Sequence, residues 1–217
     1  MKYANRLFVI ASLLPATLAL PLEAKTEKTD MFIAPFGGYS FGGGQFEINQ
    51  LDDNNQETDN TQEIGVEESS HYGFILGINT NDPGNMYLLY SRQSSELKSG
   101  GLFTPDFLTS LDLDYIHLGG TLYFPSGDLL PYITASAGVT RMMPDEWSTE
   151  TRFSMGIGGG VEYNLASNFA LFADIRGHAT FINSDNTLFC NENECLWHVT
   201  SDLMWQAQAN LGLKIGF

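Results

Sequence analysis

The sequence predicts an all-β fold, an eight-stranded antiparallel up-and-down transmembrane β-barrel, and three observations lead to this prediction. Eight stretches carry apolar side chains at every second position, which is the period of a β-strand. The connections between these stretches alternate between short turns and long polar loops. Most stretches are roughly twice as long as the five or six residues of a usual strand in a soluble protein.

The eight expected strands follow one another after residue 30. Three of the turns between them read N-D-P-G-N, P-S-G-D and L-A-S-N, in which proline, glycine and asparagine favour turn dihedral angles. Short turns at one end and long loops at the other are typical of bacterial outer-membrane barrels. The expected strands are 31–46, 72–79, 86–96, 112–124, 131–141, 152–165, 169–182 and 197–217, and the long connections are 47–71, 97–111, 142–151 and 183–196.

The strand expected at 169–182 has two faces of opposite character. Leu171 and Ile175 share one face, whereas Asp174, Arg176 and His178 share the other. A soluble barrel of the lipocalin kind would show the same alternation with its apolar face inside. The strand lengths, the charges beside small glycines and the aromatic residues near strand ends favour apolar side chains that face lipid. These aromatic residues are Phe124, Tyr163, Phe169, Phe181, Trp197 and Phe217.

Composition limits the class of protein. The chain has 217 residues, which suits one barrel or sandwich domain. Hydrophobic residues make up 43% and aromatic residues 12%, too much for a disordered chain. The formal net charge is −16, so the chain lacks the cationic surface that a nucleic-acid partner requires.

The first residues have the features of a secretory signal peptide. A short basic region around Lys2 and Arg6 precedes the apolar stretch 7–20, which is too short to span a bilayer as a helix. Small residues follow, and Ala24 is the expected last residue before cleavage, with Ala19 as an alternative. We therefore expect a signal peptide at 1–24 and an outer-membrane β-barrel domain at 25–217.

Two cysteines, Cys190 and Cys195, lie in F-C-N-E-N-E-C-L. Export to an oxidising compartment favours a disulfide between them. A zinc site is the alternative, but the pair lacks the two further ligands that a structural zinc site requires. The sequence therefore predicts a disulfide and no metal site.

The chain ends in N-L-G-L-K-I-G-F, a regular alternation that finishes on an aromatic residue. This ending resembles the C-terminal assembly signal of bacterial outer-membrane proteins, here Leu211, Leu213, Ile215 and Phe217. With its eight strands, the chain over residues 30–217 resembles small outer-membrane barrels of the OmpA transmembrane-domain, OmpX and OmpW kind. The resemblance implies a location in the outer membrane of a Gram-negative cell. No periplasmic peptidoglycan-binding domain follows the last expected strand, so we expect a stand-alone barrel. The resemblance also implies contacts with the barrel-assembly machinery, outer-membrane lipids and lipopolysaccharide.

Charged and polar residues on the inward faces are expected to form a lumenal polar network, because buried charges need partners. Eight strands leave an interior just wide enough for side chains to fill, so we expect a plugged lumen and no open pore. The expected members are His117, Glu162, Asp174, Arg176, His178, His198, Asp202 and Lys214.

A catalytic role would make His178 or His198 a general base oriented by a carboxylate. Barrel enzymes that deacylate lipid A use a His-x-Ser pair, whereas this chain has threonine at both corresponding positions, Thr180 and Thr200. No Ser-His-Asp order, metal signature or phosphate-binding loop occurs, and the G-G-G runs fall within expected strands. We therefore expect no catalytic residues and no cofactor.

The long loops are the expected place of interaction with other molecules. Residues 47–68 contain eight acidic residues and no basic one, but not the glycine and terminal glutamate of an EF-hand. A solvated loop is favoured over a calcium site or a cation-mediated bridge to lipopolysaccharide. The fourth loop, with its two cysteines, and the second, with Phe103 and Phe107, could contact a host or another surface ligand, and the two phenylalanines could equally lie on the lipid headgroups.

These observations predict a non-enzymatic outer-membrane β-barrel protein with a side-chain-filled lumen. Its expected role is structural, or one of surface interaction through long extracellular loops. The alternatives are a lipid A-modifying barrel enzyme and a narrow channel for small solutes.

Overall fold

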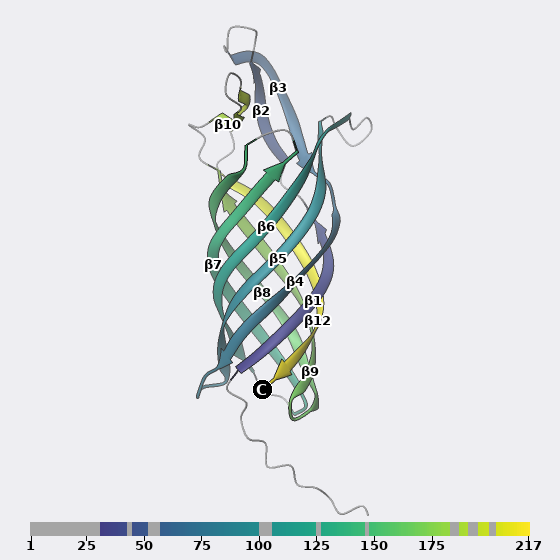
Figure 1. Ribbon diagram of the computed structural model, residues 1–217, viewed down its shortest axis with the longest axis vertical. Coiled ribbons are helices and arrows are strands. Elements are labelled where there is room, and N and C mark those ends of the chain that lie inside the picture. The colour runs from purple at the N-terminus through teal and green to yellow at the C-terminus, as the bar shows by residue number, and fades with distance from the viewer. Residues whose placement is uncertain are drawn as a thin grey trace, which may run out of the picture.

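The computed structural model is a closed β-barrel with further strands above one end (Figure 1). The backbone is described for 31–42, 45–51, 57–99, 106–124, 127–145, 148–182, 187–190, 195–199 and 203–217. Side chains are described for 31–42, 66–97, 109–124, 127–145, 148–182 and 203–217. No helix in these ranges is long and apolar enough to cross a membrane.

Eight antiparallel strands form the barrel, and the predicted fold class is confirmed. Each strand pairs with its neighbours along the chain, and the first pairs with the last, so the sheet has no free edge within the barrel. The strands are β1 (Met31–Phe41), β4 (Ser69–Asn79), β5 (Gly84–Ser99), β6 (Asp106–Tyr123), β7 (Leu129–Pro144), β8 (Glu150–Ala166), β9 (Phe169–Phe181) and β12 (Leu203–Gly216).

Four shorter strands lie beyond the end of the barrel that carries the long connections: β2 (Gln45–Leu51), β3 (Glu57–Val66), β10 (Thr187–Cys190) and β11 (Cys195–Val199). They correct three boundaries. The strand expected at 31–46 ends at Phe41, because Gly42 adopts a positive φ of 65°. The connection expected at 47–71 contains the β2–β3 hairpin. The strand expected from residue 197 begins at Leu203, and residues 195–199 form β11.

The outer wall of the barrel is apolar and its interior is polar in the middle, as the alternation predicted. Ile157 on β8 is 68% exposed and Ile175 on β9 is 60% exposed. Asp174 and Arg176, which flank Ile175 and face inward, are each 5% exposed. Because large apolar side chains cover the outside, this wall suits the acyl chains of a bilayer rather than water.

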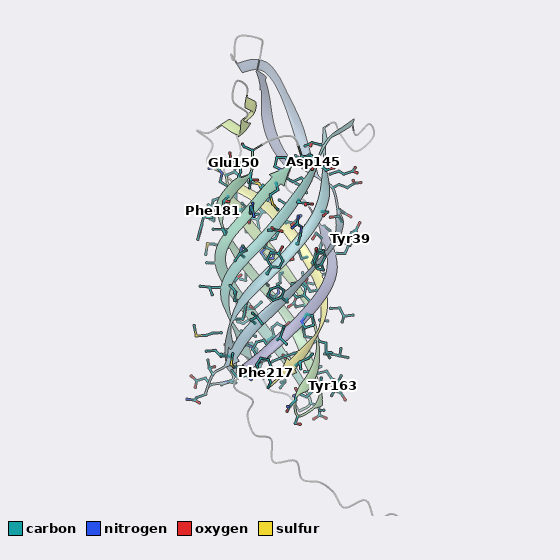
Figure 2. The ribbon with its side chains drawn as sticks, viewed as in Figure 1. Tyr39, Asp145, Glu150, Tyr163, Phe181 and Phe217 are labelled. Atoms are coloured by element: carbon teal, nitrogen blue, oxygen red, sulfur yellow. The ribbon has the colours of Figure 1, made fainter. Side chains whose placement is uncertain are left out.

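Aromatic side chains on the outer wall gather at two levels. Figure 2 shows Tyr39 and Phe181 toward the end with the long loops, and Tyr163 and Phe217 toward the opposite end. All four are exposed on the barrel surface. Aromatic side chains at two levels match the interfacial girdles of transmembrane barrels, so the apolar band between them is the membrane-facing part.

The lumen also contains an apolar layer near the long loops. Its side chains are almost completely buried and come from the loop ends of the strands, including parts of the connection expected at 97–111. This layer was not predicted, and it closes the interior above the polar residues. Its members include Leu97, Leu111, Leu113, Met142, Ile182 and Met204.

The seam between β1 and β12 closes the barrel but is interrupted at Pro35. The register pairs Ile33 with Ile215 and Phe36 with Gly212, and the two pairings between them are missing. Proline has no N–H, so Pro35 cannot donate to the carbonyl of Leu213. The seam is therefore a weak point of the ladder near the end with the short turns.

We expect Pro35→Val to raise the free energy of unfolding by about 1 kcal/mol, because the new amide restores a ladder hydrogen bond. Urea unfolding of the barrel in phospholipid vesicles would measure this. Ile33→Val is the control on the same strand: Ile33 already has an amide and its pairing with Ile215 is intact, so this substitution should bring no gain in stability. A loss of stability in the Pro35 variant would contradict the proposed weak point.

Candidate functional site: the lumenal polar network

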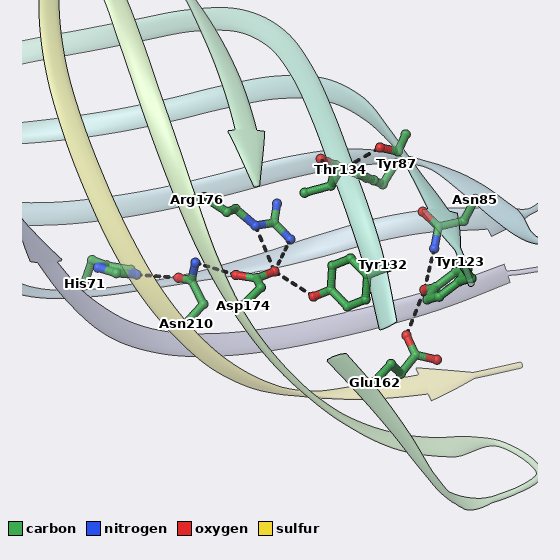
Figure 3. Close-up of polar contacts among 11 residues, drawn as sticks. His71, Asn85, Tyr87, Tyr123, Tyr132, Thr134, Glu162, Asp174, Arg176 and Asn210 are labelled. Atoms are coloured by element: carbon green, nitrogen blue, oxygen red, sulfur yellow. Dashed lines mark hydrogen bonds and ion pairs between the residues drawn. The ribbon is translucent and has the colours of Figure 1, made fainter. Parts of the chain in front are cut away.

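Asp174 is the centre of a buried hydrogen-bond network inside the barrel (Figure 3). Arg176, two residues along β9, donates to Asp174 Oδ2 from Nε at 3.0 Å and from Nη2 at 2.8 Å. Tyr132 of β7 donates its hydroxyl to the same oxygen at 2.7 Å. Asn210 of β12 donates to Asp174 Oδ1 at 2.8 Å. The carboxylate thus links three strands and neutralises a fully buried guanidinium.

The network continues through a histidine to the other side of the barrel seam. His71 of β4 donates from Nε2 to Asn210 Oδ1 at 2.6 Å, and its Nδ1 lies 2.9 Å from the hydroxyl of Ser40 on β1. A neutral ring with its proton on Nε2 satisfies both contacts, with Ser40 donating to Nδ1. One connected chain of side chains therefore joins β1, β4, β12, β9 and β7.

A second ion pair lies nearer the short turns. Lys214 of β12 is 3.2 Å from Glu162 Oε1 of β8, and its ammonium also lies 4.6 Å from the centre of the Phe32 ring. Tyr123 donates its hydroxyl to Glu162 Oε2 at 2.8 Å and accepts from Asn85 at 2.9 Å. Each charge at this level has a partner of opposite sign, as buried charges require.

Two histidines lie near the middle of the lumen without a catalytic arrangement. His117 on β6 is within 3.0 Å of the Ser136 hydroxyl and 2.7 Å of the Ser154 hydroxyl. The His178 ring packs against Tyr115, with centroids 4.5 Å apart. Neither ring nitrogen of His178 hydrogen-bonds to any described residue, so no carboxylate orients it as a base.

A small pocket in the lumen lies between the two ion pairs. It has a volume of about 20 Å³ and is lined in part by Asn85, Tyr87, Arg176 and Lys214. This volume holds about one water molecule. No group of three or more potential metal ligands occurs in the part of the chain that the structure describes.

The structure brings most of the residues of the expected network together. His117, Glu162, Asp174, Arg176, His178 and Lys214 all point into the lumen. The side chain of His198 and the whole of Asp202 lie outside the described residues. His71, Tyr132 and Asn210 belong to the network although they were not predicted as members. His71 belongs to a connection that was expected to be a loop, and tyrosine can face either the lumen or the membrane interface.

The disulfide predicted for the two cysteines and the assembly signal predicted at the C-terminal strand remain predictions. The backbone places Cys190 directly opposite Cys195 in the β10–β11 hairpin, while their side chains lie outside the described set. Of the expected assembly signal, Leu211 and Phe217 are each 64% exposed on the outer wall, and Leu213 and Ile215 are half-buried beside them.

The barrel is similar to solved outer-membrane proteins. Neisserial surface protein A is 15% identical, with 86% of this chain and 97% of that chain covered and a TM-score of 0.57. OprG from Pseudomonas aeruginosa is 14% identical, with 88% and 98% covered and a TM-score of 0.58. AlkL, solved in lipid bilayers, is 13% identical, with 96% and 97% covered and a TM-score of 0.54. At these identities the likeness concerns the fold alone.

No curated protein sequence matches the chain. A family model of the outer membrane protein beta-barrel domain matches residues 12–217, which is almost the whole chain. Together with the apolar outer wall and the closed eight-stranded sheet, this match establishes both family and location. The chain belongs to the outer membrane protein beta-barrel domain family, and the protein resides in the outer membrane.

Proposed function

We propose that the protein is a non-enzymatic surface-interaction protein whose barrel anchors an ordered extracellular sheet. The strand order β10–β11–β2–β3–β5 carries this proposal. β11 pairs with β2 through His198–Asn49 and Val199–Ile48, so the fourth connection joins the first. β3 pairs with the barrel strand β5 at three positions, from Ile64–Ser99 to Val66–Leu97. The β2–β3 hairpin is therefore continuous with the barrel sheet. We call these five strands the surface sheet.

The surface sheet supports a binding role because ordered loops lose less conformational entropy on binding than free ones. Long loops of outer-membrane barrels lie on the extracellular side, and Figure 1 shows β2 and β3 rising above the barrel beside β10. The segment 47–68 is acidic, with eight acidic residues and no basic one. A cationic partner, bound in a salt-sensitive way, is therefore the class that the surface sheet favours.

The lumen supports an anchoring role rather than a transport role. Its described charged side chains Asp174, Arg176, Glu162 and Lys214 form ion pairs, its apolar layer is almost completely buried, and the pocket between the ion pairs has room for about one water. We expect no discrete conductance steps in planar bilayers. Lipid A mass spectra that are the same in a deletion strain and its parent would disfavour the enzymatic alternative.

A cell-adhesion experiment tests the surface-sheet proposal. Parent cells, a deletion strain and a variant with residues 47–62 replaced by a short glycine-serine turn would be compared on an immobilised cationic protein such as lysozyme, at low and high salt, and on immobilised heparin as the anionic control surface. We expect the deletion strain and the turn variant to lose the same binding, while the variant barrel keeps its heat-dependent gel mobility. Equal binding by all three strains to every surface would contradict the proposal.

The predicted Cys190–Cys195 disulfide gives a second expected result. Opposite residues of an antiparallel pair have Cα atoms within the range that a disulfide spans. We expect alkylation under non-reducing conditions to leave the intact mass unchanged, and alkylation after reduction to add two labels. Cys190→Ser should weaken adhesion through the surface sheet while leaving the barrel's melting temperature unchanged. Alkylation of both thiols without reduction would rule the disulfide out.

A further inference from the structure

A row of charged side chains crosses the outer wall of the barrel. Arg92 on β5 is the cross-strand partner of Asp114 on β6, which is the partner of Arg141 on β7. These positions alternate with inward residues, so all three side chains face away from the lumen. We call Arg92, Asp112, Asp114 and Arg141 the outer charged row.

The outer charged row lies at the edge of the membrane-facing band. Two residues further toward the short turns on the same strands, the outer wall becomes aromatic and aliphatic. The residues there are Tyr90, Ile116 and Val139, with Phe153 next to them on β8. Because side chains one step lower face hydrocarbon, the charges lie at the level of the lipid headgroups on the long-loop side.

The two aspartates of the row already have partners. Arg92 Nη2 lies 2.5 Å from Asp112 Oδ2, and its Nε lies 3.8 Å from Asp114 Oδ1. The Tyr90 hydroxyl donates to Asp114 at 3.2 Å. These contacts fix Arg92 and hold Asp114 almost completely buried.

Arg141 differs from the rest of the row in having no such partner. It is exposed on the outer wall, and it forms no ion pair within 4.0 Å with any residue whose side chain is described. The other described arginine and lysine side chains, Arg152, Arg176 and Lys214, belong to inward-facing positions. Arg141 therefore places at the headgroup level a cation that has no ion-pair partner among the described side chains, and an anion would stabilise it there.

We propose that Arg141, which lies two strands from Arg92 in the outer charged row, binds a phosphate group of a lipopolysaccharide molecule in the outer leaflet. A guanidinium matches phosphate oxygens through two parallel N–H donors, which is the preferred arrangement for this anion. Arg92 is held in place by Asp112 and adds a second, fixed cation to the same row. The acyl chains of the same lipid would lie on the apolar wall below, along Ile116 and Val139.

Lipid binding to the refolded barrel in a neutral detergent tests this site. The probes are a deep-rough lipopolysaccharide that keeps its lipid A phosphates and the same lipid after enzymatic removal of those phosphates. We expect the wild-type protein to bind the phosphorylated lipid at least about tenfold more tightly than the dephosphorylated lipid. A tenfold change in affinity is the size of effect that the loss of one charge-assisted contact produces. Arg141→Ala should lose about tenfold in affinity for the phosphorylated lipid, and Arg141→Lys should lose less.

Arg152→Ala is the matched control. It removes one positive charge from the neighbouring strand, but the Arg152 side chain pairs with Glu150 at 3.2 Å and belongs to an inward-facing position. Its affinity should stay within about twofold of the wild type, and gel mobility before heating should show that every variant is folded. Equal affinity of wild type and Arg141→Ala, an equal loss in Arg152→Ala, or equal binding of both lipids would each overturn the proposal.

Discussion

Asp174→Ala is expected to lower the free energy of unfolding by about 3–5 kcal/mol, which is the largest loss that we expect from a single substitution in the barrel. The variant leaves the guanidinium of Arg176 buried at 5% exposure without its carboxylate. Tyr132 and Asn210 also lose the oxygen atoms to which they donate. Inside the barrel no bulk water replaces these partners, so the full cost of the unpaired groups appears as lost stability.

Urea unfolding of the refolded barrel in phospholipid vesicles, followed by gel mobility and tryptophan fluorescence, would measure this effect. Glu150→Ala is the control, because its ion pair with Arg152 lies at the mouth of the barrel with both side chains partly exposed. It should cost less than about 1 kcal/mol. The double variant Asp174→Leu/Arg176→Met should recover at least about 2 kcal/mol, because no unpaired charge remains. A single variant as stable as wild type would contradict the role of Asp174.

Gly138→Ala has the second-largest expected effect, a loss of about 2–3 kcal/mol. Gly138 faces inward on β7, and a Cβ atom there would lie 2.0 Å from the carbonyl oxygen of Ile116 and 2.7 Å from the Cα of His117. Both atoms belong to the backbone of β6, which cannot rotate away as a side chain can. The barrel must therefore shift one strand against the next to accept a methyl group.

Gly177→Ala is the matched control in the same barrel. Gly177 faces outward on β9, and the nearest atom to its added Cβ would be the Ile157 carbonyl oxygen at 3.9 Å, an ordinary contact. This change should alter stability by less than about 0.5 kcal/mol. The same urea titration compares both variants. Equal stabilities of the two alanine variants would show that the narrow approach of β7 to β6 does not limit the side chain at position 138.

The period-two alternation was sufficient to predict the barrel and its apolar exterior. On β8, Phe153, Ile157 and Tyr163 lie on the outer wall as expected, because burying Arg152 and Glu162 inside leaves their neighbours facing lipid. The alternation did not locate the ends of strands beyond the membrane. β6 begins at Asp106, within a connection that was expected to be a loop, since strands outside the bilayer need not keep an apolar face.

The surface sheet could not be predicted from the sequence for a related reason. Its pairing of β11 with β2 joins segments far apart in the chain, and their polar composition gives no periodic signal. The expected strand from residue 197 merged β11 with β12, because apolar residues continue through L-W-H-V. The break at Gly42 between β1 and β2 depends on a positive φ that glycine permits but does not require.

The polar network was predicted in part, and the part that was missed depends on strand register. The pair Asp174 and Arg176 is visible in the sequence, because both lie on one face of one strand. The contact of His71 with Asn210 crosses the seam between the first and last strands of the barrel. Such contacts depend on the stagger between neighbouring strands around the closed sheet. A single sequence does not reveal this stagger, because it does not show which residues pair across the strands.

Depth-dependent quenching by brominated lipids tests the central claim most directly, that apolar side chains face acyl chains while charged ones fill the lumen. Trp147, Trp197 and Trp205 would be replaced by phenylalanine, and one tryptophan placed at Ile175 or at Phe172. Ile175 is 60% exposed and Phe172 is 5% exposed. In vesicles brominated on their acyl chains, we expect strong quenching of the Ile175→Trp protein and little quenching of the Phe172→Trp protein. The reverse order would contradict the claim.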